Sequence, residues 1–117
     1  ADADRRTALE SAGVRPLAVA EDAAGRLDIA AALDRLAAEG ITRLLCEGGG
    51  RLAASLLAAD RADEIALFTA GRAIGGDGMA AIAGLGLDRL ADAPHFDRIG
   101  VECLGPDILT RWRRAAP

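Results

Sequence analysis

The chain has 117 residues, a length that one compact domain accounts for. Its net charge of −4 and its aromatic content of 3% argue against nucleic acid as a partner, because phosphates attract basic surfaces and RNA-binding folds stack bases on aromatic rings. No apolar run approaches the roughly 20 residues that a helix needs to cross a membrane. We therefore expect neither a nucleic-acid nor a membrane partner.

The first half of the chain predicts helices that alternate with strands. A helix begins at the acidic residues 2–4 and ends before Gly13. Residues 16–20 form a short strand, and after a polar loop Asp28 caps a second helix that Gly40 ends.

The second half continues the alternation and ends differently. Residues 41–46 read as a buried strand, three glycines follow, and a helix then presents an apolar face of Leu52, Ala53, Leu56 and Leu57. A strand covers 65–70, and a long glycine-rich loop comes next. The segments 98–104 and 108–113 flank a Gly-Pro-Asp turn, which is typical of a hairpin.

This order predicts an α/β fold with a mixed, mostly parallel sheet, flanking helices and a C-terminal β-hairpin. Helices between successive strands are the usual connections in a parallel sheet, whereas a terminal hairpin adds antiparallel strands.

The two cysteines, Cys46 and Cys103, each lie in an apolar run. This placement favours two buried free thiols in a reducing compartment such as the cytoplasm. A disulfide or a metal pair is the alternative, and no residue is assigned as a metal ligand.

The glycine turn, residues 47–50, joins the strand at 41–46 to the following helix. Glycines at a helix start bring backbone N–H groups and the positive end of a helix dipole to one point, which suits a phosphate. Residues 48–53 formally match the dinucleotide fingerprint, but the acid expected after the next strand is replaced by Gly71-Arg72. A chemically silent turn is the alternative.

Glu47 is the acidic residue of this turn. At the carboxyl end of a parallel strand, its carboxylate can accept hydrogen bonds from sugar hydroxyls or stabilise developing positive charge. Alternatively, it caps nearby N–H groups. Ser55, one turn further on, bonds either a ligand or its own backbone, and the backbone is favoured.

A second glycine-rich segment and the single histidine each allow a functional and a structural interpretation. The segment 75–78, Gly-Gly-Asp-Gly, brings backbone close to a ligand or is a flexible surface loop. His95 stands beside a proline with no partner pattern, which favours a structural or solvent role.

Taken together, the segment 44–57 with its Glu-Gly-Gly motif, the Asp63-Glu64 pair before a strand and the Gly-Gly loop at 75–76 resemble the reductase domain of the bifunctional riboflavin-biosynthesis deaminase–reductase. The closing segment 107–113 also resembles that family's last strand, so the resemblance covers about residues 28 to 114.

The resemblance implies a dihydrofolate-reductase-like fold and an activity. The family uses NADPH to reduce 5-amino-6-(5-phosphoribosylamino)uracil to its ribitylamino form, and its members form homodimers. Glu47 matches the family's substrate-binding glutamate. The residues that match its cofactor segment are Gly49, Gly50, Arg51, Leu52, Ala53, Ala54 and Ser55, and no catalytic residue is assigned.

The sequence also departs from the family. Gly50 stands where a proline is usual, so we expect a less preorganised turn. We interpret residues 1–117 as one partial reductase domain without the deaminase domain, and we expect it to be inactive alone. The alternatives are a related oxidoreductase with another substrate and a non-catalytic oligomerisation module.

Overall fold

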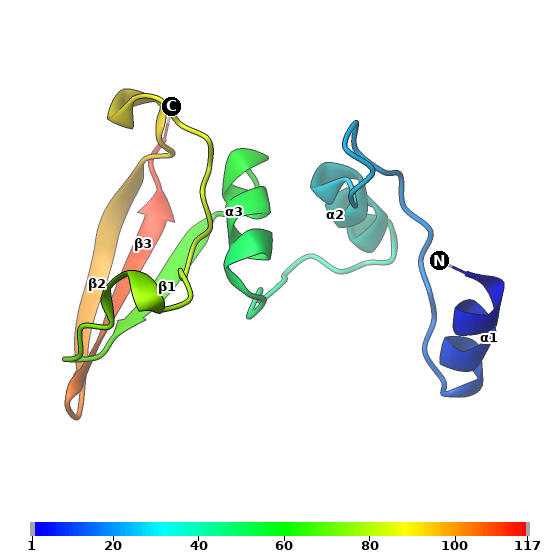
Figure 1. The fold of residues 1–117 in the computed structure, drawn as a ribbon, viewed down its shortest axis with the longest axis horizontal. Helices are drawn as coiled ribbons and strands as arrows, with labels where there is room; N and C mark the ends of the chain where they lie inside the picture. Colours follow the sequence, from blue (N-terminus) through cyan, green and yellow to red (C-terminus); the bar gives the residue numbers. More distant parts are fainter. Residues whose placement is uncertain (1, 117) are drawn as a thin grey trace. The chain divides into compact units, whose positions relative to one another are not determined.

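The computed structural model describes residues 2–116, which divide between Leu44 and Leu45 into two compact units (Figure 1). The first unit contains two helices, α1 (Ala3–Ser11) and α2 (Ile29–Ala38). The second contains α3 (Gly50–Ala58), β1 (Glu64–Thr69), β2 (Phe96–Leu104), β3 (Asp107–Arg114) and two short 3-10 turns, η1 (Gly75–Asp77) and η2 (Leu90–Asp92). Among these residues, no helix has the length and apolar character needed to span a membrane.

The two helices of the first unit begin where the sequence predicts, and the Asp28 cap is confirmed. The Asp2 carboxylate accepts a hydrogen bond from the backbone N–H of Asp4 at 3.0 Å, and Asp28 accepts one from Ala31 at 3.0 Å. These bonds satisfy donors that have no partner within the helix. The predicted ends are also confirmed, because Gly13 and Gly40 follow the helices with φ of 79° and 85°.

The sheet has the order β1-β3-β2, and both pairings are antiparallel. The predicted hairpin is confirmed: β2 and β3 pair from Leu104 and Asp107 outward across Gly105-Pro106. Gly105 has a φ of 62°, and the proline that follows requires a negative φ. These two conditions define a type II′ turn, whose twist matches that of the adjoining strands.

Two predicted strands are absent, and with them the parallel part of the sheet. Residues 16–20 and 41–46 carry no strand, and Leu45 is 80% exposed rather than buried. A strand needs a neighbour for its N–H and C=O groups. Within the described part of the chain, the only pairing before β1 is the single bridge between Glu21 and Leu27.

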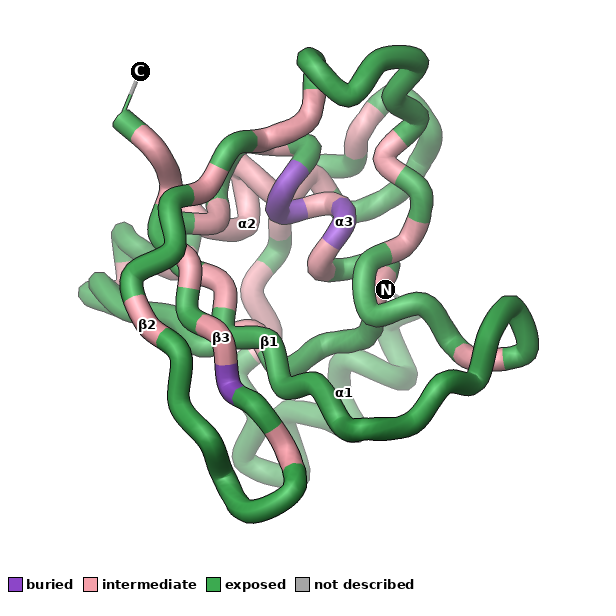
Figure 2. The backbone as a smooth tube through the Cα atoms, turned by 90° about the vertical axis from the view of Figure 1, so that its left-hand side faces the viewer, coloured by how far each residue is buried: buried purple, intermediate pink, exposed green. Residues whose placement is uncertain are grey.

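The core lies in the second unit and is small. Figure 2 shows the buried residues on α3 and β3. They are Ala54, Leu56, Leu57 and Leu109. Leu52, which the sequence placed on the apolar face of α3, is 41% exposed, so that face is rotated toward Ala54. The prediction of two buried thiols is also wrong: Cys46 is half-buried and Cys103 is exposed, and both are free.

The carboxyl end of α3 is fastened to the end of β3 through Arg114. Its guanidinium forms an ion pair with Asp60, donates to the carbonyl of Ala62 at 2.6 Å and lies 5.9 Å from the centre of the Phe96 ring. The backbone N–H of Arg114 donates to the Asp63 carbonyl at 2.8 Å. One side chain therefore joins β3, β2 and the connection between α3 and β1.

Replacing this arginine should destabilise the chain. We expect Arg114→Ala to lower the free energy of unfolding by about 1–3 kcal/mol, because it removes a charge-assisted hydrogen bond and a cation–π contact from a side chain that is only 24% exposed. Arg111→Ala is the matched control on the same strand. Arg111 is 58% exposed and 3.9 Å from Glu102, so its loss should cost under about 0.5 kcal/mol. Urea unfolding measures both, and equal losses would contradict the role of Arg114.

Candidate functional site

The start of α3 presents backbone N–H groups that have no partner within the helix. Gly49 precedes the helix with φ −63° and ψ 171°, and it has no side chain that could cap the first turn. The N–H groups of Leu52 and Ala53 donate to the Gly49 carbonyl at 3.0 and 3.2 Å. The N–H groups of Gly50 and Arg51 come before the first intrahelical donor, so they remain available to an anion.

The two charged side chains of the turn have opposite signs, and both reach solvent. Glu47 and Arg51 are exposed, and neither forms an ion pair or accepts or donates a side-chain hydrogen bond within residues 2–116. The alternative that Glu47 caps the helix is therefore not realised. A carboxylate before the helix and a guanidinium in its first turn can serve two chemically different ends of a ligand.

The remaining predicted site residues lie along α3 and differ in accessibility. Ala54 is buried and faces the core, whereas Ala53 and Ser55 are half-buried and Leu52 is exposed. The Ser55 hydroxyl donates to the Arg51 carbonyl at 3.0 Å, which is the backbone bond that the sequence favours. The first turn is thus the part of the segment best exposed to a ligand.

The segment 80–83, which no motif in the sequence indicated, contacts this first turn. The N–H of Ala83 donates to the Gly50 carbonyl at 2.9 Å. A Cβ placed on Gly50 would overlap the carbonyl oxygen of Ala80 and lie 3.2 Å from that of Ala81. The run Ala-Ala-Ile-Ala offered a weak signal, because small side chains permit close approach of two backbones.

The predicted Gly-Gly loop forms the 3-10 turn η1 and is exposed. Gly75 requires glycine, with a φ of 66°. Its flanking apolar side chains are open to solvent: Ile74 is 69% exposed and Met79 is 94% exposed. His95 is exposed as well.

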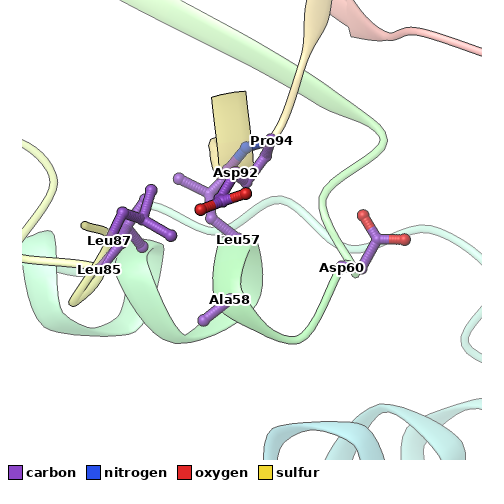
Figure 3. A pocket seen from close by; sticks show the side chains of 7 residues that line it. All are labelled: Leu57, Ala58, Asp60, Leu85, Leu87, Asp92 and Pro94. Atoms are coloured by element: carbon purple, nitrogen blue, oxygen red, sulfur yellow. The ribbon is translucent and has the colours of Figure 1, made fainter. Parts of the chain in front are cut away.

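A cavity of about 350 Å³ lies at the other end of α3, away from the glycine turn (Figure 3). Its two carboxylates already have partners: Asp60 pairs with Arg114, and both Asp92 oxygens accept from Arg89 at 2.8 and 3.0 Å. The residues that line the cavity are Leu57, Ala58, Asp60, Leu85, Leu87, Asp92 and Pro94. None of them belongs to the predicted site.

Comparison with known proteins defines the class of this domain. The family model of the RibD C-terminal domain matches residues 1–110. In solved structures, a RibD of Acinetobacter baumannii is similar with a TM-score of 0.76 and 21% identity, over 94% of this chain and 29% of that one. This likeness concerns the fold, in which helices accompany the sheet in an α/β arrangement.

Curated relatives agree. The riboflavin biosynthesis protein RibD of Escherichia coli is 34% identical over 95 residues, which are 81% of this chain and 26% of that protein. The 2,5-diamino-6-ribosylamino-4(3H)-pyrimidinone 5′-phosphate reductase of Methanothermobacter thermautotrophicus is 34% identical over 88 residues, 74% of this chain and 41% of that one. The chain belongs to the RibD C-terminal domain family, and it spans about a quarter to two fifths of the length of these relatives.

Proposed function

We propose that this chain is part of a reductase of riboflavin biosynthesis that takes a hydride from NADPH. The observation that carries the proposal is the family match over residues 1–110, which includes the whole glycine turn and α3. The proposed substrate is 5-amino-6-(5-phosphoribosylamino)uracil, whose ribosylamino group becomes a ribitylamino group.

The cofactor proposal rests on the first turn of α3. The N–H groups of Gly50 and Arg51 can donate to phosphate oxygens, and the positive end of the helix dipole favours their charge. The exposed guanidinium of Arg51 suits the extra phosphate that distinguishes NADPH from NADH, because arginine binds phosphate through a planar pair of donors. We propose Gly49, Gly50, Arg51, Leu52, Ala53, Ala54 and Ser55 as the cofactor segment, with contacts concentrated at its start.

The substrate proposal rests on Glu47. Its exposed carboxylate has no partner among the described residues, so it is free to accept hydrogen bonds from ribose hydroxyls. A negative charge beside the sugar also favours the positively charged iminium form of the substrate, which is the form that can accept a hydride. Glu47 would thus bind and polarise the substrate.

The archaeal relative widens the substrate class. It is named for a 2,5-diamino-6-ribosylamino pyrimidinone 5′-phosphate and is as similar as the bacterial protein, at 34% identity. The shared chemistry is a ribosylaminopyrimidine 5′-phosphate, and the choice between the two compounds depends on one substituent of the pyrimidine ring. A related oxidoreductase with another substrate and a non-catalytic oligomerisation module are the other candidates.

The proposed function also implies a particular assembly and sheet. Residues 1–117 would belong to a reductase domain of a cytoplasmic homodimer. The mostly parallel dihydrofolate-reductase-like sheet would require strand partners for 16–20 and 41–46, and we expect this chain alone not to reduce the substrate.

Cofactor binding tests the proposal without requiring turnover. We expect calorimetric titration of this chain to show saturable binding of NADPH that is tighter than binding of NADH. Arg51→Gln should weaken NADPH binding about threefold to tenfold and bring the two affinities together, since at an exposed position the loss is close to the net contribution of one ordinary hydrogen bond. Arg111→Gln is the matched control, because Arg111 is an exposed arginine of the sheet. It should change the affinity for neither NADPH nor NADH. A folded chain without NADPH binding would favour the non-catalytic module.

A further inference from the structure

The first turn of α3 has no cap of its own. Gly49 supplies no side-chain oxygen, and it lies within three consecutive glycines, the residue type with the largest conformational freedom. Such a start should fray, and its N–H groups should point in no fixed direction. An anion site of this kind loses affinity because ordering the backbone opposes binding.

The segment 80–83 is the tertiary contact that opposes fraying. It donates the Ala83 N–H to the Gly50 carbonyl at 2.9 Å. The carbonyl oxygen of Ala80 would overlap a Cβ on Gly50, and that of Ala81 would lie 3.2 Å from it. Glycine is needed at position 50 because the contact leaves no space for a side chain. The backbone conformation does not require it, since the φ of Gly50 is not positive. A proline there also has a Cβ and would meet the same obstruction.

We infer that the 80–83 segment is a positioning element for the cofactor segment: by fastening Gly50 it orients the N–H groups of Gly50 and Arg51 toward one ligand. The inference rests on the proposed NADPH site and adds to it a segment 30 residues further along the chain, in place of a local helix cap. Gly50 thus allows the close packing of the segment 80–83. That contact orders the turn, although its three glycines would leave it flexible by itself.

Two substitutions break the contact from opposite sides. Gly50→Ala introduces a Cβ that overlaps the Ala80 carbonyl oxygen, so the segment 80–83 must move away. Helix propensity alone would favour this substitution, because alanine forms helices better than glycine. Ala83→Pro removes the N–H donor and lies outside the cofactor segment, so it cannot block a phosphate directly. Gly84→Ala is the matched control, since nothing lies within 4 Å of a Cβ at that position and its φ is ordinary.

We expect Gly50→Ala and Ala83→Pro each to raise the dissociation constant of NADPH about threefold to tenfold, the equivalent of one hydrogen bond's net contribution, and Gly84→Ala to leave it unchanged. Amide hydrogen exchange without cofactor is the second measurement. The Ala83 N–H should be protected in the unsubstituted chain and lose protection in Gly50→Ala, which a merely local helix effect would not produce.

The outcomes separate this inference from the proposed function. Folded variants that bind NADPH as tightly as the unsubstituted chain would overturn the positioning role. If the unsubstituted chain does not bind NADPH, the proposed function fails, and the exchange measurement decides about the contact itself. A protected Ala83 amide that Gly50→Ala exposes then supports the fastening of the first turn, and an unprotected one overturns it.

Discussion

Leu109→Ala should lower the free energy of unfolding by about 2–4 kcal/mol, which is the usual cost of removing a buried leucine side chain. Leu109 lies on the central strand β3 and is 6% exposed, between Phe68 of β1 and Glu102 of β2. Only four apolar side chains of the described residues are buried, so no other part of the core can compensate. For a domain whose total stability is about 5–15 kcal/mol, this loss is large.

Ile108→Ala is the control for that substitution. Ile108 is the neighbouring residue on β3, has a side chain of the same volume and is 42% exposed. Because it already contacts water, its truncation should cost less than about 1 kcal/mol. Urea unfolding followed by circular dichroism compares the two. A larger loss for Ile108 than for Leu109 would show that the opposite face of the sheet is the one packed in solution.

Glu47→Gln should lower kcat/KM about 10- to 100-fold in a complete reductase that carries this segment. The substitution keeps the size of the side chain and removes its charge. It therefore removes the charge-assisted part of the hydrogen bonds to the ribose and the stabilisation of positive charge on the iminium, which together correspond to about 1.5–3 kcal/mol. Steady-state oxidation of NADPH in the presence of substrate measures the effect.

The control for Glu47 is Glu102→Gln, the same chemical change at an exposed position of β2. It should leave kcat/KM within about twofold of the parent, as expected for a surface charge. The affinity for NADPH should be unaffected by Glu47→Gln, because the carboxylate is proposed to contact the sugar of the substrate. Unchanged turnover and KM in Glu47→Gln would remove this residue from the site.

Local signals in the sequence predicted the helices and the hairpin. Asp2 and Asp28 cap helices, Gly13 and Gly40 follow them, and Gly105 allows the turn between β2 and β3. Each signal acts within a few residues of its effect, so a single sequence contains it. The mostly parallel sheet was not predictable in this way, because an apolar run such as 41–46 becomes a strand only beside a partner that pairs with it.

The same distinction between local and distant signals applies to the candidate site. The exposed turn at Glu47 and the helix that starts at Gly50 follow from glycines and periodicity. The contact from Ala83 does not, since it joins residues far apart in sequence through backbone atoms that every residue type possesses. The buried face of α3 was predicted only in part: Leu56 and Leu57 are buried as expected, but Leu52 is exposed and Ala54 is buried. Leucine and alanine occur on both sides of this helix, so only packing decides which side is buried.

The most direct test of the central claim is where NADPH binds on α3. A titration of the isotopically labelled chain, followed through its amide resonances, should shift Gly49, Gly50 and Arg51 first and most. Resonances at the other end of the helix, where Asp60 and Leu57 line the cavity, should stay in place. Saturating shifts confined to that cavity, or no shifts in a folded chain, would contradict the proposal that the glycine turn holds the cofactor.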